Sequence, residues 1–360
     1  MLRKGWIASI ITVMSLSMAA CGGKTSGSAD TTGAAPEAST ASTSSEAMNS
    51  GEAAAAEIKI VFGTPEVDGM PTDTMSHWVA EEINKRSEGR IYVELHNQST
   101  LGGDTELVGQ VMNGTIPMVG LSISALSQYT DLFECTQLPF LLDNYEKEKA
   151  AFDSEEYAAL VEAVESSLNL KFLGSAENGM RHFATKNKQI NTMEDLKGLK
   201  LRVMTSNVIQ ETITGLGANV TTMAYNEVYT GLQNGVIDGE EINITSAAFQ
   251  KHYEVIKYIN NMGLYPFPAV YVVNGDYWNK LSAEDQQLIE EVFAEGHDKA
   301  FDEFLPNIEE NCVKICKDGG VTFNDIEDIT PFVDTVTGLY DEYAAKDEKI
   351  AAFIEMAKKL

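Results

Sequence analysis

Strands and helices alternate along two separate stretches of this chain, and this alternation limits the possible folds more than any other feature of the sequence. Strands are recognised by alternating or continuous apolar residues, and helices by apolar residues three and four apart. In the first stretch, strands are predicted at 57–63, 90–96 and 116–122, with helices at 71–89 and 104–114. In the second, strands are predicted at 198–204 and 219–224, with helices at 206–217 and 225–235. The pattern predicts two α/β units that meet near residues 175–180, each a mostly parallel sheet covered on both faces.

A long helix is predicted after the second unit, from Ser282 to about Lys317. Ser282 and Asp285 suit its first turn, since they are close to the capping-box pattern. Pro306 lies inside this stretch and predicts a kink or break, because proline has no N–H to donate. Such a helix is longer than one small unit needs and could run along both. Residues 329–360 predict two further helices.

The N-terminus has the composition of a secretion signal. A basic head, MLRKG, precedes an apolar stretch from Trp6 to Ala20, which is short for a permanent membrane span. Cys21 follows directly, and MAACGG resembles a bacterial lipobox with Met18 in place of the usual leucine. We predict that residues 1–20 are a signal peptide and that Cys21 is lipidated. The alternatives are an uncleaved anchor or an ordinary signal with a chance cysteine.

Residues 22–56 consist mostly of Ser, Thr, Ala, Gly and Glu, and Met48 is their only large apolar residue. A segment of this composition cannot bury enough apolar surface to fold. We therefore predict a disordered tether from the lipidated cysteine to residue 56, with an r.m.s. span of roughly 30 Å. No later stretch is long and apolar enough to cross a bilayer.

The charge of the chain excludes some partners. Its 26 basic and 54 acidic residues give a formal net charge of −28. This charge argues against nucleic acid or a bare anionic membrane as a partner. An anionic ligand would need a local cationic site that overrides the global field.

Signatures of catalysis and metal binding are missing from the sequence. The five histidines are scattered, and no phosphate-binding loop, nucleophile elbow or HExxH motif is present. Cys135, Cys312 and Cys316 cannot all pair, and they suit small packing residues better than a zinc site. The neighbouring acids Glu240 and Glu241 are expected on a solvated face. We predict neither an enzyme nor a bound cofactor or metal.

Residues 193–241, MEDLKGLKLRVMTSNVIQETITGLGANVTTMAYNEVYTGLQNGVIDGEE, closely resemble the hallmark region of one transporter family. This family is the solute-binding proteins of TRAP (tripartite ATP-independent periplasmic) transporters, the C4-dicarboxylate-binding or DctP type. Four more segments resemble it: LGGDTELVGQVMNGTIPM, LPFLLDNYE, GMRHFATKNKQINTMEDLKG and YWNKLSAEDQQLIEEV. Together they span about residues 57–300, and the last sixty residues are less distinctive.

The resemblance implies an α/β, two-lobed fold of the periplasmic-binding-protein type. A ligand cleft lies between the lobes and a long helix runs along both. The first lobe is expected to comprise 57–178 and about 265–305, and the second 179–264 and about 306–360.

The resemblance also assigns ligand-binding roles to residues of both lobes. Arg202, in the predicted strand GLKLRV, faces the cleft in proteins of this kind and clamps a substrate carboxylate. From the strand alone, a salt bridge to a neighbouring acid explains Arg202 equally well. Arg181 either contacts the ligand or holds Arg202 in place. Tyr225 lies where the family often has an aromatic residue near the ligand, or it packs at a helix start.

Two more positions carry over from the first lobe, and one position departs from the family pattern. Asp104 and Ser122 align with residues that contact ligand in some members, although loop or surface roles fit as well. Ile242 occupies the position where the family commonly has an asparagine. Either Asn243 replaces that amide or the contact is missing, which leaves the identity of the substrate open.

The function implied is capture of a small organic acid outside the cytoplasmic membrane and its delivery to an ion-gradient-driven TRAP permease. C4-dicarboxylates, uronates, sialic acids and 2-oxo acids are the candidate ligands. The protein is expected to be a monomer, held to the membrane through its lipid alone. The alternatives are a solute-binding lipoprotein of an ABC importer, a ligand-presenting sensory module, and an enzyme on a two-lobed scaffold.

Overall fold

The computed structural model describes residues 56–360. The predicted signal peptide, Cys21 and the tether up to residue 55 lie outside the described residues. Among the described helices, none has the length and apolar character of a membrane span.

Five strands form the first sheet, in the order β2-β1-β3-β10-β4. Their bounds are β1 Ile58–Gly63, β2 Ile91–His96, β3 Met118–Ser122, β4 Leu170–Glu177 and β10 Pro268–Asn274. β1 pairs in parallel with β2 and β3, whereas β10 is antiparallel to both of its neighbours. We call this sheet and the helices packed on it the first lobe.

Six strands form the second sheet, in the order β11-β9-β5-β8-β6-β7. Their bounds are β5 His182–Thr185, β6 Lys200–Val203, β7 Asn219–Thr222, β8 Gly239–Ile242, β9 Tyr258–Asn261 and β11 Thr322–Asp325. β6 pairs in parallel with β7 and β8, whereas β5 is antiparallel to β8 and β9. This sheet and its helices form the second lobe.

Both sheets are mixed. Two of the four strand pairs of the first sheet are parallel, and three of the five of the second, so the prediction of mostly parallel sheets holds for the second sheet but not for the first. The antiparallel strands are those reached by crossing between the lobes. β4 leads into β5 through residues 178–181, and β9 leads into β10 through residues 262–267, in both cases without an intervening helix. Parallel neighbours need a long crossover connection, usually helical. A strand that arrives from the other sheet has no such connection to impose a parallel direction.

Helices cover both lobes and bury three apolar clusters. In the first lobe they are α2 Pro71–Arg86, α3 Asp104–Met112, α4 Tyr145–Phe152, α5 Glu155–Leu168 and α10 Gly275–Trp278. In the second lobe they are α6 Met193–Leu196, α7 Asn207–Gly215, α8 Val228–Asn234 and α9 Ile244–Phe249. Short 3₁₀ turns occupy Ile123–Gln128, Glu134–Gln137, Tyr225–Glu227 and His252–Glu254. Cys135, Cys312 and Cys316 are free and buried in these clusters, as expected of small packing residues.

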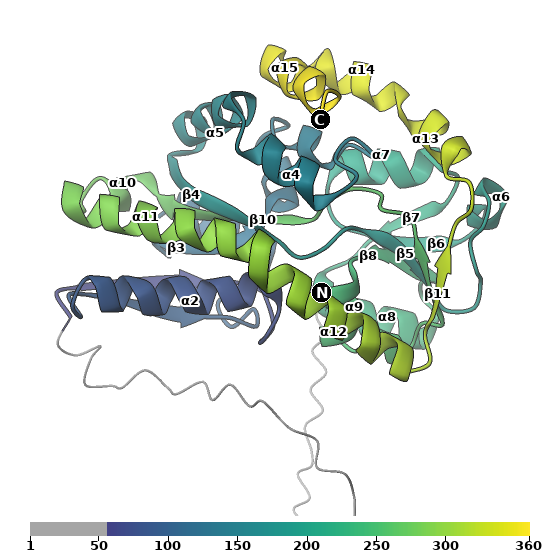
Figure 1. Cartoon of the computed structure of the whole chain (residues 1–360), viewed down its shortest axis with the longest axis horizontal. Helices are drawn as coiled ribbons and strands as arrows, with labels where there is room; N and C mark the ends of the chain where they lie inside the picture. Colours follow the sequence, from purple (N-terminus) through teal and green to yellow (C-terminus); the bar gives the residue numbers. More distant parts are fainter. Residues whose placement is uncertain (1–55) are drawn as a thin grey trace, which may run out of the picture. The chain divides into compact units, whose positions relative to one another are not determined.

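One long helical stretch runs along both lobes, as the resemblance implied (Figure 1). It comprises α11 Ala283–Lys299, a π-helical turn Ala300–Phe304, and α12 Leu305–Asp318. α11 packs on α2 and β4 of the first lobe, and α12 packs on α9 of the second. Regular α-helical bonding is interrupted just before Pro306, in agreement with the predicted break, because proline cannot donate to the preceding turn.

Three helices, rather than the two expected, follow β11: α13 Thr330–Val336, α14 Gly338–Ala344 and α15 Glu348–Ala357. α13 packs on α7 of the second lobe, whereas α15 packs on α4 and α5 of the first. The expected lobe limits stay a prediction, and the packing of α15 favours grouping this helix with the first lobe.

Candidate functional site

Two adjoining cavities lie between residues of the two lobes. The smaller measures about 20 Å³ and the larger about 550 Å³. Both are lined by Pro65, Asp104, Arg202, Met204 and Tyr225. The smaller cavity is also lined by Glu66, Ser122, Asn178, Arg181, Ser246 and Phe267. A space of 20 Å³ holds about one water molecule. A ligand larger than water therefore has to extend into the larger cavity or separate the lobes.

Arg202 occupies the boundary between these cavities. It lies on β6 between Leu201 and Val203, which are fully buried, and is itself 2% exposed. Its Nε and Nη2 donate to the carbonyl oxygen of Met223, at 3.0 and 2.9 Å. Nη1 donates no hydrogen bond within residues 56–360. Burial lowers the pKa of Arg202, and the charges of Glu241 and Glu240 oppose that effect. Arg202 therefore lines the cavity with its Nε–Nη2 edge held by the backbone and its Nη1 without a hydrogen-bond partner among the described residues.

Arg181 lines the smaller cavity from the segment between β4 and β5. Its Nε pairs with Glu241 Oε2 at 2.5 Å, and its Nη2 donates to the Glu241 carbonyl at 2.7 Å. Its Nη1 donates to Asn243 Oδ1 at 3.0 Å, and its guanidinium stacks on the ring of Phe267, 4.1 Å from the centroid. The charge of Arg181 is thus neutralised within the second lobe by Glu241.

The expectation that Glu240 and Glu241 lie on a solvated face was wrong. Both are completely buried, because β8 lies between β5 and β6 in the sheet. Successive residues of a strand point to opposite faces. Glu241 accordingly meets Arg181 on one face, and Glu240 Oε1 pairs with His252 Nδ1 at 2.7 Å on the other.

Asn243 lies behind the cavity rather than in its lining. It is completely buried, and its Nδ2 donates to the Asn178 carbonyl at 2.6 Å and to Thr245 Oγ1 at 2.9 Å. Its Oδ1 is taken by Arg181. Ile242, at the family's usual asparagine position, is buried in the apolar cluster of α8, α9 and α12. In this arrangement the amide of Asn243 is used within the protein, and a ligand contact by Asn243 stays a prediction.

The other three predicted residues line the cavities. Tyr225 is half-buried at the start of a 3₁₀ turn and lines both. Asp104 is the first residue of α3, and its Oδ1 accepts a hydrogen bond from the backbone N–H of Ser122 at 2.8 Å. Ser122 ends β3, and its hydroxyl oxygen accepts from the N–H of Ser124 at 3.2 Å. Burial raises the pKa of Asp104, and both this hydrogen bond and the charge of Arg202 oppose the shift.

Sequence reasoning missed Glu66, Asn178, Ser246 and Phe267. Glu66 is 7% exposed, and its Oε1 accepts from Asn178 Nδ2 at 3.0 Å. Burial, with repulsion from Asp104 and Asp73, raises the pKa of Glu66 to about 8. Glu66 follows the carboxyl end of β1 by three residues, and Asn178 directly follows β4. The rule that ligands bind beyond the carboxyl ends of strands could have pointed to both.

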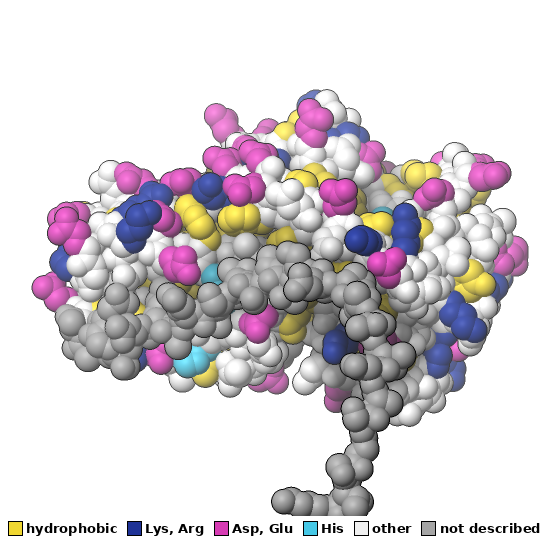
Figure 2. All heavy atoms as spheres, turned by 60° about the horizontal axis from the view of Figure 1, so that its bottom comes forward, with side chains coloured by type: hydrophobic (Ala, Val, Ile, Leu, Met, Phe, Trp, Pro, Cys, Tyr) yellow, Lys and Arg dark blue, Asp and Glu magenta, His cyan; other side chains and the backbone are white. Residues whose placement is uncertain are grey.

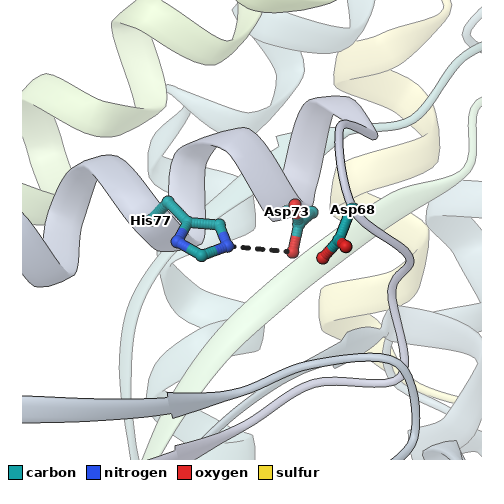
Figure 3. A group of neighbouring side chains, drawn as sticks. All are labelled: Asp68, Asp73 and His77. Carbon is teal, nitrogen blue, oxygen red and sulfur yellow. Dashed lines mark ion pairs between the residues drawn. The ribbon is translucent and has the colours of Figure 1, made fainter. Parts of the chain in front are cut away.

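A cluster of possible metal ligands lies outside the cavity linings. Within the described residues, Asp68, Asp73 and His77 are the one such group (Figure 3). His77 Nε2 is 3.7 Å from Asp73 Oδ1. Asn97 already donates to both aspartates, at 2.6 and 2.9 Å, and the backbone N–H of Gly69 donates to Asp73 at 2.9 Å. The carboxylate oxygens are used by amide donors, so this cluster gives no evidence for a metal.

An anionic ligand needs a local cation, because the net charge of the chain is −28. Acidic and basic side chains are interspersed on the face of the described residues shown in Figure 2. Arg202 is 2% exposed and offers an Nη1 that has no hydrogen-bond partner among the described residues. Electrostatic attraction is stronger in such a site than on the surface.

Comparisons with known proteins agree with this site. Residues 68–347 match the family model DctP, described as bacterial extracellular solute-binding protein, family 7. The C4-dicarboxylate-binding periplasmic protein DctP of Rhodobacter capsulatus is 28% identical over 83% of this chain and 91% of its own length. The sialic acid-binding periplasmic protein SiaP of Vibrio cholerae is 26% identical over 74% of this chain and 82% of its own length.

Solved structures give the same result. A TRAP periplasmic solute-binding protein of Anaerococcus prevotii with bound α/β-D-glucuronate is 27% identical, with a TM-score of 0.79 over 84% of this chain and 97% of that one. One from Xanthobacter autotrophicus with bound β-D-galacturonate is 26% identical, with a TM-score of 0.79 over 83% and 99%. The chain therefore belongs to the DctP family, bacterial extracellular solute-binding proteins of family 7, and is the substrate-binding protein of a TRAP transporter for a small organic acid.

Proposed function

We propose that Arg202 binds the carboxylate of the transported acid through its Nη1–Nη2 edge. The observation that carries this proposal is a guanidinium that is 2% exposed, lines both cavities and has an Nη1 without a hydrogen-bond partner in the described residues. The carbonyl of Met223 holds the Nε–Nη2 edge and thereby fixes the plane of the fork. A planar fork can donate two parallel hydrogen bonds to one carboxylate.

Arg181 and Asn243 act mainly as positioning residues in this proposal. Arg181 ties β8 to the segment between β4 and β5 through Glu241 and Asn243. Asn243 extends these contacts to Asn178, which in turn reaches Glu66 of the first lobe. These bonds support the cavity wall beside Arg202.

Binding closes the protein because each lobe contributes part of the lining. Glu66, Asp104 and Ser122 come from the first lobe, and Arg202 and Tyr225 from the second. A ligand that contacts both walls favours the arrangement in which the walls are close. The closed protein, as a monomer, then docks on the TRAP permease and releases the acid unchanged. Capture without chemistry is supported by relatives that are binding proteins.

The protein acts outside the cytoplasmic membrane and is held there by a lipid on Cys21. The basic head, the short apolar stretch and the small residues before Cys21 support this part of the proposal. Cys21→Ala should abolish lipid attachment, seen as loss of labelling by a fatty-acid analogue and of membrane fractionation. Ligand affinity should stay unchanged, because the predicted tether separates Cys21 from the folded body.

Calorimetry on Arg202 variants tests the carboxylate clamp. A thermal-shift screen with D-galacturonate, D-glucuronate, N-acetylneuraminate, succinate and pyruvate first identifies a binding acid, since a ligand of the folded state raises its apparent stability. Arg202→Ala should then lose about 2–5 kcal/mol of binding free energy, or about 30-fold to several thousand-fold in affinity. Arg202→Lys should also bind poorly, because an ammonium cannot reproduce the fork.

Arg86→Lys on α2 is the matched control, since Arg86 pairs with Glu82 and Glu295 on the surface. It should bind like the wild type. Circular dichroism must show that each variant is folded. Near-normal affinity in a folded Arg202→Ala protein would remove Arg202 from the site, and stabilisation by neutral sugars alone would contradict an acid as the ligand.

A further inference from the structure

Two carboxyl groups stand in the same cavity as the arginines. Glu66 and Asp104 line the first-lobe wall of the smaller cavity, and Arg181 and Arg202 line its second-lobe wall. Glu66 is 7% exposed and follows β1, whereas Asp104 begins α3 and also borders the larger cavity. A cavity for an anion would ordinarily avoid acids. Their presence therefore calls for an explanation based on the ligand.

The smaller cavity has one arginine in its lining that is not paired with a carboxylate, and it can therefore balance the charge of one ligand carboxylate. Arg181 is neutralised by Glu241, through contacts at 2.5 and 2.7 Å. Arg202 makes no ion pair with a carboxylate in the described residues and is hydrogen-bonded only to a carbonyl. It is therefore the one cation of the smaller cavity's lining that is open to a ligand anion. Arg202 and Asp104 attract each other, because the positive charge of Arg202 opposes the rise in the pKa of Asp104.

The first-lobe wall offers acceptors for hydroxyl groups. Oδ1 of Asp104 accepts from the N–H of Ser122, and Oε1 of Glu66 accepts from Asn178. The second oxygen of each carboxyl group accepts no hydrogen bond from another described residue. An unused oxygen on each of these two cavity-lining carboxyl groups can accept a hydrogen bond from a ligand O–H group.

We propose that Glu66 and Asp104 make this protein selective for monocarboxylic acids that carry hydroxyl groups, such as uronates, and exclude C4-dicarboxylates. The ligand carboxylate lies on Arg202, and ligand hydroxyls lie against Glu66 and Asp104. This inference rests on the proposed function, namely carboxylate capture by Arg202. It adds the class of acid and assigns Glu66 a part in specificity.

The electrostatics of Glu66 support the exclusion of a second carboxylate. Burial and the charges of Asp104 and Asp73 raise the pKa of Glu66 to about 8, so this group keeps its proton at neutral pH. A protonated carboxyl group both donates and accepts, and therefore fits a hydroxyl in either direction. A second ligand carboxylate at this wall would add another negative charge beside Asp104 with no cation to balance it. Like charges juxtaposed in a binding site cost several kcal/mol.

Matched acids separate this inference from the proposed function. The ligands for calorimetry are D-galacturonate and D-glucuronate, succinate and fumarate, and a neutral sugar, D-galactose. We expect at least one uronate to bind at least 100-fold more tightly than either dicarboxylate. Tighter binding of succinate or fumarate, lost in Arg202→Ala, would overturn the inference and leave the carboxylate clamp standing. Binding of galactose alone would overturn both.

Variants of the two acids test their roles directly. Asp104→Asn keeps an oxygen for the N–H of Ser122 and removes the charge, and Glu66→Gln keeps the shape of the side chain. Each should lower uronate affinity about ten-fold or more, and the double variant should narrow the ratio of uronate to succinate affinity at least 100-fold. Glu81→Gln, on the exposed side of α2, removes one negative charge away from the cavity and should change neither affinity nor ratio.

Folding of each variant is checked by thermal unfolding in the absence of ligand. A purely structural role for the two acids predicts loss of stability with an unchanged ratio of uronate to succinate affinity. That result, or a double variant with the wild-type ratio, would refute the assignment.

Discussion

Glu148 and Glu177, both completely buried, and the partly buried Glu309 lie beside the segments that cross between the lobes. Glu177 ends β4, and its Oε1 accepts the backbone N–H groups of Gly179 at 2.5 Å and Phe267 at 2.9 Å. Glu148 lies on α4, and neither of its carboxyl oxygens has a hydrogen-bond partner among residues 56–360. Glu309, on α12, accepts from the Tyr145 hydroxyl at 2.8 Å. No described lysine, arginine or histidine forms an ion pair with any of the three.

Burial raises the pKa of all three groups, and the charge of Glu177 adds to the effect on Glu148. Glu148 and Glu177 are completely buried and close enough for one carboxyl group to hydrogen-bond to the other. That bond requires a proton between them. The folded protein therefore keeps a proton that the unfolded chain releases above its ordinary glutamate pKa of about 4.3.

The consequence for stability has a definite sign. A group whose folded pKa is raised contributes stability that is fully present below its unfolded pKa and is lost as pH rises through the folded pKa. From about pH 4.3 upwards, the proton held by the pair should therefore lower the free energy of unfolding by about 1.4 kcal/mol per pH unit. Glu148→Gln removes this dependence, because an amide can donate permanently to Glu177 Oε2, which lacks a partner among the described residues. The variant should be more stable than the wild type at pH 7 and above.

Urea unfolding at pH 5, 6, 7 and 8 without ligand measures the effect. The difference in the free energy of unfolding between Glu148→Gln and wild type should grow in favour of the variant by up to about 1.4 kcal/mol per pH unit. Other acids with raised pKa values, including Glu66, are present in both proteins and cancel. Glu146→Gln, exposed on the same helix, is the control and should follow the wild-type profile. Parallel pH profiles for Glu148→Gln and wild type would refute the shared proton.

Two further substitutions test the second sheet. Gly239→Ala should destabilise the protein by about 1–3 kcal/mol, since a Cβ there would lie 2.4 Å from the Ala184 carbonyl oxygen. Gly338→Ala, where a Cβ meets nothing within 4 Å, should not lower the urea midpoint. Glu241→Gln should lower the free energy of unfolding by about 3–5 kcal/mol, because it leaves the buried Arg181 without its counter-ion. A wild-type urea midpoint for Gly239→Ala would contradict the close packing of β8 on the Ala184 carbonyl. A wild-type urea midpoint for Glu241→Gln would contradict the stabilising ion pair with Arg181.

The sequence predicted local elements well where the local pattern determines them. The strand around Arg202, the helices α2, α3, α7 and α8, and the break before Pro306 depend on apolar spacing and on the chemistry of proline. Strand directions depend instead on how the chain crosses between sheets. Nothing within β10 distinguishes an antiparallel strand from a parallel one, and the prediction of a mostly parallel sheet was therefore wrong for the first sheet.

The environment of each charged residue was the least predictable feature. Arg202 was identified by its motif, but its partner, the Met223 carbonyl, lies on another segment 21 residues away. Glu240 and Glu241 resemble solvated acids in the sequence, because only the order of strands shows that β8 is internal. Their partners, His252 and Arg181, come from different segments as well.

The net charge of −28 suggested that an anionic ligand needs a local cation. Arg202, which is 2% exposed, offers such a cation inside the protein. The cavity contains two arginines, yet Glu241 uses the charge of one of them. Specificity then depends on how many charges remain unpaired around the ligand, and composition cannot supply that number. Two proteins with the same arginine motif can therefore bind different acids, if the segment after β1 or the start of α3 carries a different residue. In this chain those positions hold Glu66 and Asp104, and they favour hydroxyl groups over a second carboxylate.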